Sequence, residues 1–187
     1  MNSDRDAILL VLSVAAQWFA ILLFAEAVLH KLRDFPDFLG IISGYRLMPF
    51  PLLKPVSVLI VIAELIAILS MLIAIPFFKS LASIMLLVYA MAMTVNIARG
   101  RHEIDCGCGG ASMPVNPALV YRNIFLAAAI GWAVTESHPG SLFIQLELFH
   151  LSTTLALTAC LVILYMSFNQ LCSNLGFHRR MLERSST

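Results

Sequence analysis

The sequence predicts an all-α membrane protein, a polytopic helical bundle of about five transmembrane helices in one integral membrane domain. Of its 187 residues, 60% are hydrophobic and only 12% are charged, whereas about a quarter of the residues of a soluble domain are charged. The formal net charge is +1, and no basic run is long enough to bind phosphates. We therefore expect a lipid membrane, and no nucleic acid, as the surroundings of this chain.

Five apolar stretches are long enough to cross a bilayer core of about 30 Å, which needs about 20 apolar residues per helix. They are residues 8–29, 52–75, 77–98, 117–135 and 148–171. Pro76 fits a tight turn between the second and third stretches, because proline cannot continue a helix. The first stretch ends in the small-x-small pattern of a signal-peptide cleavage site, but it is longer than the usual apolar region of such a peptide. We therefore expect it to be a transmembrane helix.

Two connecting loops are long. In residues 31–50, the segment from Pro36 to Ser43 is expected to form a short helix, with a proline near its start and Gly44 after its end. Its apolar residues would then lie in the membrane interface. The alternative is an ordinary connecting loop. The other long loop, residues 99–116, carries the most specific motif of the sequence.

That motif is Ile104-Asp105-Cys106-Gly107-Cys108-Gly109-Gly110. Thiols at i and i+2 can come within the Cα separation that a disulfide needs, provided that the backbone bends sharply, and Gly107 permits such a bend. So small a ring is expected to be strained and easily reduced. The spacing therefore favours Cys106 and Cys108 as the catalytic pair of a thiol-disulfide exchange site.

The flanking charges bear on thiolate formation. Arg99, Arg101 and His102 favour the thiolate, which is the attacking species. Asp105 and Glu103 oppose it. Two alternatives stay open: a metal site built on His102 and the two cysteines, and a glycine-rich loop with idle thiols.

The other two cysteines, Cys160 and Cys172, lie outside the motif and far from it in the sequence. Cys160 lies in the middle of the fifth span and is expected to pack as a small hydrophobe. Cys172 lies at the end of that span, on the membrane face of the motif, where it is either idle or a third thiol of an exchange relay.

Several polar residues interrupt the spans at the level of the motif. Crossing counts place Glu26, Arg122 and Asn123 on the membrane face of the cysteines. Glu64 is the deepest acid, and an intramembrane charge costs at least about 2.5–3.5 kcal/mol on insertion scales. The functional interpretation is a polar pocket in which Glu26 pairs with Arg122 and Glu64 lines a proton or quinone path. The alternatives are side chains that reach the interface and a protonated Glu64 bonded to a neighbouring helix.

The chain resembles the MauE family of methylamine utilization proteins, within the wider DoxX-like group. The resemblance covers most of the chain and rests on Lys31-Leu32 and the stretch Phe38…Tyr45…Leu47-Met48-Pro49. Above all it rests on Ile104-Asp105-Cys106-Gly107-Cys108-Gly109, which Arg122-Asn123 follows. At Gly109, many relatives have phenylalanine.

This resemblance implies an inner-membrane accessory protein for the maturation of methylamine dehydrogenase, whose small subunit is dense in disulfides. It implies MauD, a thioredoxin-like protein, and that small subunit as partners, and thiol-disulfide oxidoreductase activity if the chain is an enzyme. The layout also resembles vitamin K epoxide reductase, an analogy that makes a membrane quinone the candidate cofactor. The alternatives are a quinone-linked oxidoreductase subunit of DoxX type and a structural anchor for a thioredoxin-like protein.

Two arguments disagree on the orientation in the membrane. With five spans, the loops on the cysteine side and the C-terminal tail share one face. The basic residues on that face are Lys31, Arg33, Arg46, Arg99, Arg101, Arg179, Arg180 and Arg184. The positive-inside rule places such a face in the cytoplasm. Cytosolic thiols, however, are kept reduced, so the exchange chemistry predicts that the cysteine loop faces the periplasm.

Overall fold

The computed structural model describes residues 2–73, 80–107, 113–136 and 148–185, and the described part folds into six helices. They are α1 (Asn2–Arg33), α2 (Phe35–Tyr45), α3 (Phe50–Leu72), α4 (Leu81–Ala98), α5 (Pro117–Glu136) and α6 (Leu148–Ser185). Five of them, all except α2, contain a segment long and apolar enough to cross a membrane. The predicted all-α bundle of five spans is therefore confirmed, and the chain is a multi-pass membrane protein.

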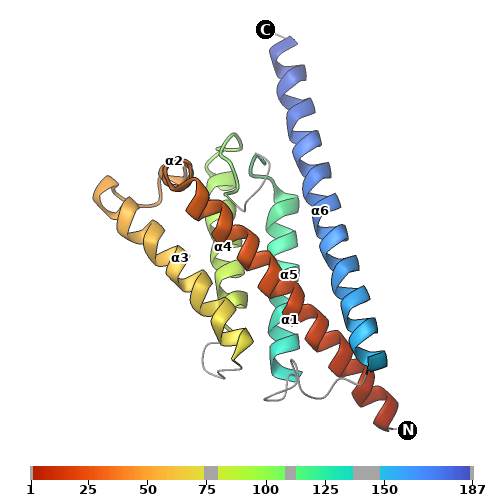
Figure 1. The fold of residues 1–187 in the computed structure, drawn as a ribbon. Coiled ribbons are helices and arrows are strands. Elements are labelled where there is room, and N and C mark those ends of the chain that lie inside the picture. Colours follow the sequence, from red (N-terminus) through yellow and green to blue (C-terminus); the bar gives the residue numbers. More distant parts are fainter. Residues whose placement is uncertain (1, 74–79, 108–112, 137–147, 186–187) are drawn as a thin grey trace.

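The helices α4 and α5 pack together along their length, and α1 crosses them obliquely between α3 and α6 (Figure 1). The helix α2 and the loop that joins α4 to α5 lie at the same end of the bundle as the C-terminus, and the N-terminus lies at the other end (Figure 1). This arrangement places the cysteine loop and the tail on one side of the five crossings, as the sequence predicts.

The helix ends differ from the predicted ones in a way that matters for the site. The helix α1 continues to Arg33, past the predicted end at residue 29, so Lys31 lies on a helix rather than in a loop. The helix α3 ends at Leu72 and α4 begins at Leu81, whereas the sequence predicts residues 75 and 77. The predicted turn at Pro76 lies outside the described residues.

The predicted short helix before α3 is confirmed, with its own caps. The Asp34 side chain accepts a hydrogen bond from the Asp37 N–H at 3.3 Å, and Pro36 lies in the first turn, where its missing N–H costs nothing. Arg46 ends the helix in the left-handed conformation, with φ of 46°. The helix packs on α3 and its apolar face is partly buried against the bundle, so its place in the membrane interface stays a prediction.

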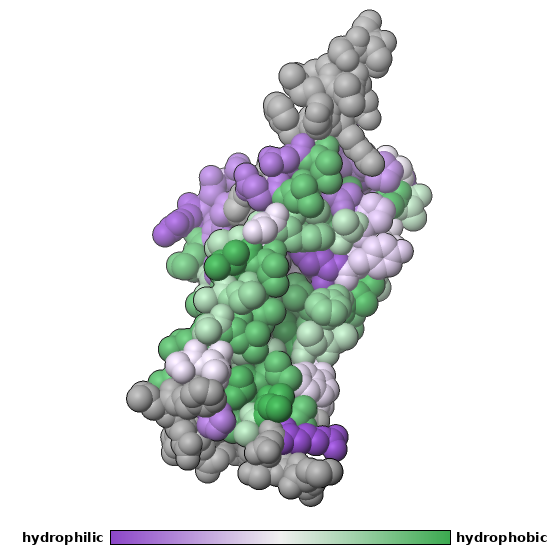
Figure 2. Space-filling model, turned by 90° about the vertical axis from the view of Figure 1, so that its right-hand side faces the viewer, coloured by the Kyte–Doolittle hydropathy of each residue, from purple (hydrophilic) through white to green (hydrophobic). Residues whose placement is uncertain are grey.

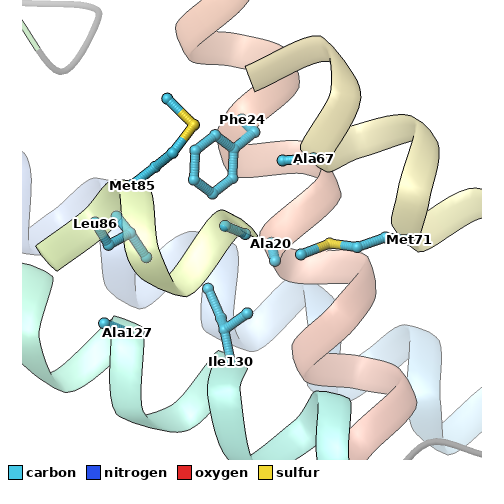
Figure 3. Packing of buried hydrophobic residues seen from close by; sticks show 9 residues of the cluster. Ala20, Phe24, Ala67, Met71, Met85, Leu86, Ala127 and Ile130 are labelled. Carbon is cyan, nitrogen blue, oxygen red and sulfur yellow. The ribbon is translucent and has the colours of Figure 1, made fainter. Parts of the chain in front are cut away.

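Small and flexible side chains fill the centre of the bundle. Ala20 and Phe24 of α1 meet Ala67 and Met71 of α3, while Met85 and Leu86 of α4 and Ala127 and Ile130 of α5 close the cluster (Figure 3). Alanine allows helices to approach closely, which matters in a membrane because lipid leaves little hydrophobic drive for association. On the face that Figure 2 shows, apolar residues cover the middle of the bundle and hydrophilic residues gather toward the C-terminal end.

Cys160 is on this outer surface. It is exposed on α6, so the expectation that it packs as a small buried hydrophobe is wrong. In the most apolar segment of α6, only 11% of the residues are buried against the other helices. A mid-span residue on its outward face therefore contacts lipid.

Candidate functional site

A small backbone bridge fixes the two ends of the cysteine loop. The Cys106 N–H donates to the Met113 carbonyl and the Val115 N–H donates to the Ile104 carbonyl, both at 2.9 Å. The Asp105 carboxylate accepts from the Met113 N–H at 3.0 Å. These bonds hold Cys106 firmly just before the residues that lie outside the described part of the loop.

Gly107 provides the sharp bend that the motif predicts. Its φ is +70°, in the left-handed region that glycine adopts without strain. A Cβ atom at this position would lie 3.0 Å from Cγ2 of Ile41 on α2. Glycine is therefore required here both by the backbone conformation and by the close approach of α2 to the loop.

Tyr45 ties the same loop to α2. Its hydroxyl donates to the Cys106 carbonyl at 3.1 Å. Burial, and then the nearby charge of Asp105, raises the pKa of Tyr45. The hydroxyl therefore stays protonated and remains a donor over the whole physiological pH range.

Cys106 is buried and belongs to a disulfide, whereas Cys160 and Cys172 are free thiols. Cys108 lies outside the described residues, so its pairing with Cys106 stays a prediction. A disulfide-bonded sulfur is not a thiolate ligand, and the described residues contain no group of three His, Cys, Asp or Glu side chains that could hold a metal ion. Because Cys108 is also one of the three ligands of the alternative metal site, that alternative stays a prediction as well. The disulfide-bonded state of Cys106 is the state that thiol-disulfide exchange starts from.

A cavity of about 270 Å³ lies beneath the loop. Cys106 and Gly107 form part of its wall, and α1, α2, α3 and α4 contribute mostly aliphatic and aromatic side chains. Four of the predicted site residues line it: Cys106, Glu64, Arg122 and Asn123. The sequence therefore identified much of the polar lining of a cavity that the fold assembles.

The most polar part of the cavity is a buried ion pair. The Lys31 ammonium lies 2.5 Å from Oε1 of Glu64, and their side chains are 5% and 0% exposed. The Tyr89 hydroxyl donates to the same oxygen at 2.6 Å. The ammonium also lies 5.4 Å from the ring centroid of Phe38 and 5.6 Å from that of Tyr89, within cation–π range. Lys31 of α1 thus contacts α2, α3 and α4.

Arg122 is held by α5 and α6. It donates to Oδ1 of Asn123 at 3.1 and 3.0 Å and to Oδ1 of Asn169, and its guanidinium lies 5.2 Å from the Tyr165 ring centroid. Glu26 is exposed on α1, and Lys31–Glu64 is the one ion pair among the described residues. The expected pairing of Glu26 with Arg122 is therefore wrong, because α1 turns Glu26 outward.

The remaining predicted residues surround the loop rather than the cavity. Arg99 and His102 are exposed and Arg101 is partly buried. Arg99 donates to the Arg46 carbonyl at 3.4 Å, which links the loop to the end of α2. Cys172 is buried in the same hydrophobic cluster as Cys106, on the membrane side that crossing counts predict.

Sequence reasoning missed Lys31 as a buried residue, and with it Tyr45 and Tyr89. One signal was present for Lys31, because an acid as deep as Glu64 requires a partner and Lys31 follows an apolar span directly. No periodicity distinguishes Tyr45 at the end of α2, or Tyr89 in the middle of α4, from other aromatic residues of the chain.

The fold and the cavity together define a multi-pass helical membrane protein with a disulfide-bonded cysteine above a buried ion pair. Residues 8–136 match the family described as methylamine utilisation protein MauE. The chain belongs to this family.

Proteins named methylamine utilization protein MauE from three organisms resemble the chain. The protein from Paracoccus denitrificans is 35% identical over 136 residues, which are 68% of this chain and 73% of the relative. The protein from Methylorubrum extorquens is 38% identical over 128 residues, or 66% and 69% of the two chains. The protein from Paracoccus versutus is 34% identical over 133 residues, or 67% and 72%. No solved structure gives a significant match.

The ion pair makes a prediction about stability. Replacing Lys31 with Met alone, or Glu64 with Leu alone, should lower the free energy of unfolding by about 3–5 kcal/mol, because each change leaves an uncompensated buried charge. The double variant should recover most of this loss. Unfolding in mixed detergent micelles measures it, with the exposed Lys54 changed to Met as the control. Additive losses in the double variant would contradict a direct pairing.

Proposed function

We propose that this chain is a membrane accessory protein for methylamine utilisation that supports the maturation of methylamine dehydrogenase by thiol-disulfide exchange. Cys106 and Cys108 are the exchanging pair. The partners are a thioredoxin-like protein, MauD, and the dehydrogenase small subunit, whose disulfides must form. The observation that carries the proposal is the disulfide-bonded Cys106, held by Gly107 and Tyr45 at the wall of a buried cavity.

The proposed exchange transfers two electrons and two protons from the partner protein to this chain. A thiolate of the partner attacks one sulfur of the Cys106 disulfide, the S–S bond of this chain breaks, and a mixed disulfide forms. A second partner thiolate then attacks the mixed disulfide. The partner leaves with a new S–S bond, and this chain keeps two thiols, having gained two electrons and two protons. Arg99 and His102, exposed at the base of the loop, favour the thiolates that the exchange needs.

Two other functions make different demands on the same residues. A quinone-linked oxidoreductase subunit of DoxX type would use the cavity without the cysteines, and a structural anchor would need neither. Only the exchange function requires both sulfurs. Loss of the cysteines therefore separates the exchange function from the other two, and bound quinone without cysteine dependence would favour the subunit of DoxX type.

Serine variants of the cysteines test the exchange function. Cys106→Ser or Cys108→Ser should abolish the accumulation of mature methylamine dehydrogenase in cells, because one sulfur cannot complete the exchange. Cys160→Ser should leave it unchanged, since Cys160 is on the outward face of α6. Immunoblots of the small subunit and amine oxidation in extracts measure the outcome. Wild-type levels of correctly bridged subunit in the double Cys106→Ser/Cys108→Ser variant would exclude the exchange function.

The orientation in the inner membrane follows from the same chemistry. A dithiol relay stays oxidised only where the reducing systems of the cytoplasm do not reach it. We therefore place the cysteine loop on the periplasmic side. The ion pair with Glu64 also removes Lys31 from the count of loop charges, which weakens the opposing argument from the positive-inside rule.

Reporter fusions test this orientation. A reporter fused after Asn116 should read as periplasmic, and one fused after Glu136 should read as cytoplasmic, because α5 separates the two sites. Alkaline phosphatase and green fluorescent protein provide opposite readouts. A cytoplasmic result after Asn116 would contradict the periplasmic relay and favour the structural anchor.

A further inference from the structure

The cavity continues beyond the cysteine to the outer surface of the bundle. Leu47 and Val88 both belong to its lining, and they are 41% and 49% exposed. Val88 lies in the middle of α4, a membrane-spanning helix. A molecule dissolved in the hydrocarbon can therefore reach the cavity from the side.

Two buried polar groups in the cavity wall lack partners. Oε2 of Glu64 and the side-chain nitrogen of Asn123 make no hydrogen bond within the described residues, and these side chains are 0% and 1% exposed. An unpaired buried group of this kind has lost its hydrogen bonds to water without a replacement, which is unfavourable. One is an acceptor and one is a donor, so a bound molecule with oxygen atoms can satisfy both.

The size and chemistry of the cavity restrict its occupant. Its lining is mostly apolar, and its volume of about 270 Å³ suits one substituted ring better than a lipid head group with two acyl chains. The Lys31 ammonium adds a positive charge at the polar end. The disulfide-bonded Cys106 adds a redox-active sulfur to the same wall.

We propose that this cavity binds the head group of a membrane quinone, which reoxidises the thiols of Cys106 and its proposed partner Cys108 after exchange. This inference rests on the proposed function and names its electron acceptor. Two S–H bonds break and one S–S bond forms, while two electrons and two protons pass to the quinone. Its two carbonyl oxygens become the hydroxyls of a quinol.

The polar groups of the cavity fit both forms of this ligand. Lys31 and the Asn123 amide donate to a quinone oxygen and stabilise the negative charge that develops on it during reduction. Oε2 of Glu64 accepts from a hydroxyl of the quinol. Tyr89 keeps the other Glu64 oxygen occupied, so Oε2 remains available to the ligand.

The test uses the full chain in lipid nanodiscs with decylubiquinone, a short-tailed ubiquinone analogue, as the probe. Val88→Trp should fill the mouth of the cavity, whereas Leu87→Trp, on the neighbouring and equally exposed residue (48% against 49%), does not touch it. Prereduced protein should reduce one quinone per chain under anaerobic conditions. The half-saturating quinone concentration should rise by about tenfold or more in Val88→Trp, which corresponds to the loss of about 1.4 kcal/mol, and stay unchanged in Leu87→Trp.

Three results separate the possible failures. Equal effects of the two tryptophan variants would overturn the site. Displacement of the probe by a saturated fatty acid as readily as by a second quinone would show an apolar groove for any acyl chain, and would also overturn it. The exchange step is measured separately, with oxidised glutathione as the disulfide. Quinone binding by a chain whose thiols do not exchange would support the site and contradict the proposed function.

Discussion

The packing of α1, α2, α3 and α4 beneath the cysteine loop depends on the buried ammonium of Lys31. It lies on α1, pairs with Glu64 of α3, and is covered by the rings of Phe38 of α2 and Tyr89 of α4. Each charge alone would be costly in the membrane, and the pair becomes tolerable only when the four helices meet in one arrangement. The ion pair therefore adds to the apolar contacts of Phe38 with Val28 and Val61 in fixing the packing of α2.

The position of α2 in turn determines the position of the cysteine. Tyr45 at the end of α2 bonds to the Cys106 carbonyl, and Ile41 lies against Gly107 so closely that no Cβ fits. The backbone bonds to Met113 fix the loop from the other side. Cys106 is consequently at the boundary between a buried apolar cavity and the polar end of the bundle. Its side chain lines the cavity and is only 9% exposed, so Cys106 is the buried member of the proposed pair.

The sequence predicted the features that depend on local pattern. Hydrophobic length was sufficient for the five spans, proline and capping residues for α2, and the glycine between two cysteines for the bend at Gly107. It did not predict features that depend on how helices rotate about their axes. Glu26 and Lys31 lie close together on α1, yet Glu26 is outside and Lys31 is 4% exposed. Lipid-facing and core-facing positions are both apolar in a membrane, so periodicity cannot tell them apart, and Cys160 was misplaced for the same reason.

The central claim is that Cys106 and Cys108 exchange electrons as a pair on the periplasmic side. A membrane-impermeant maleimide tests it most directly in intact cells, on a variant whose Cys160 and Cys172 are serine. Labelling of quenched cells should leave the pair unmodified, and mild reductant should then expose both thiols without permeabilisation. Full labelling before reduction, or labelling only after the cells are permeabilised, would contradict the account.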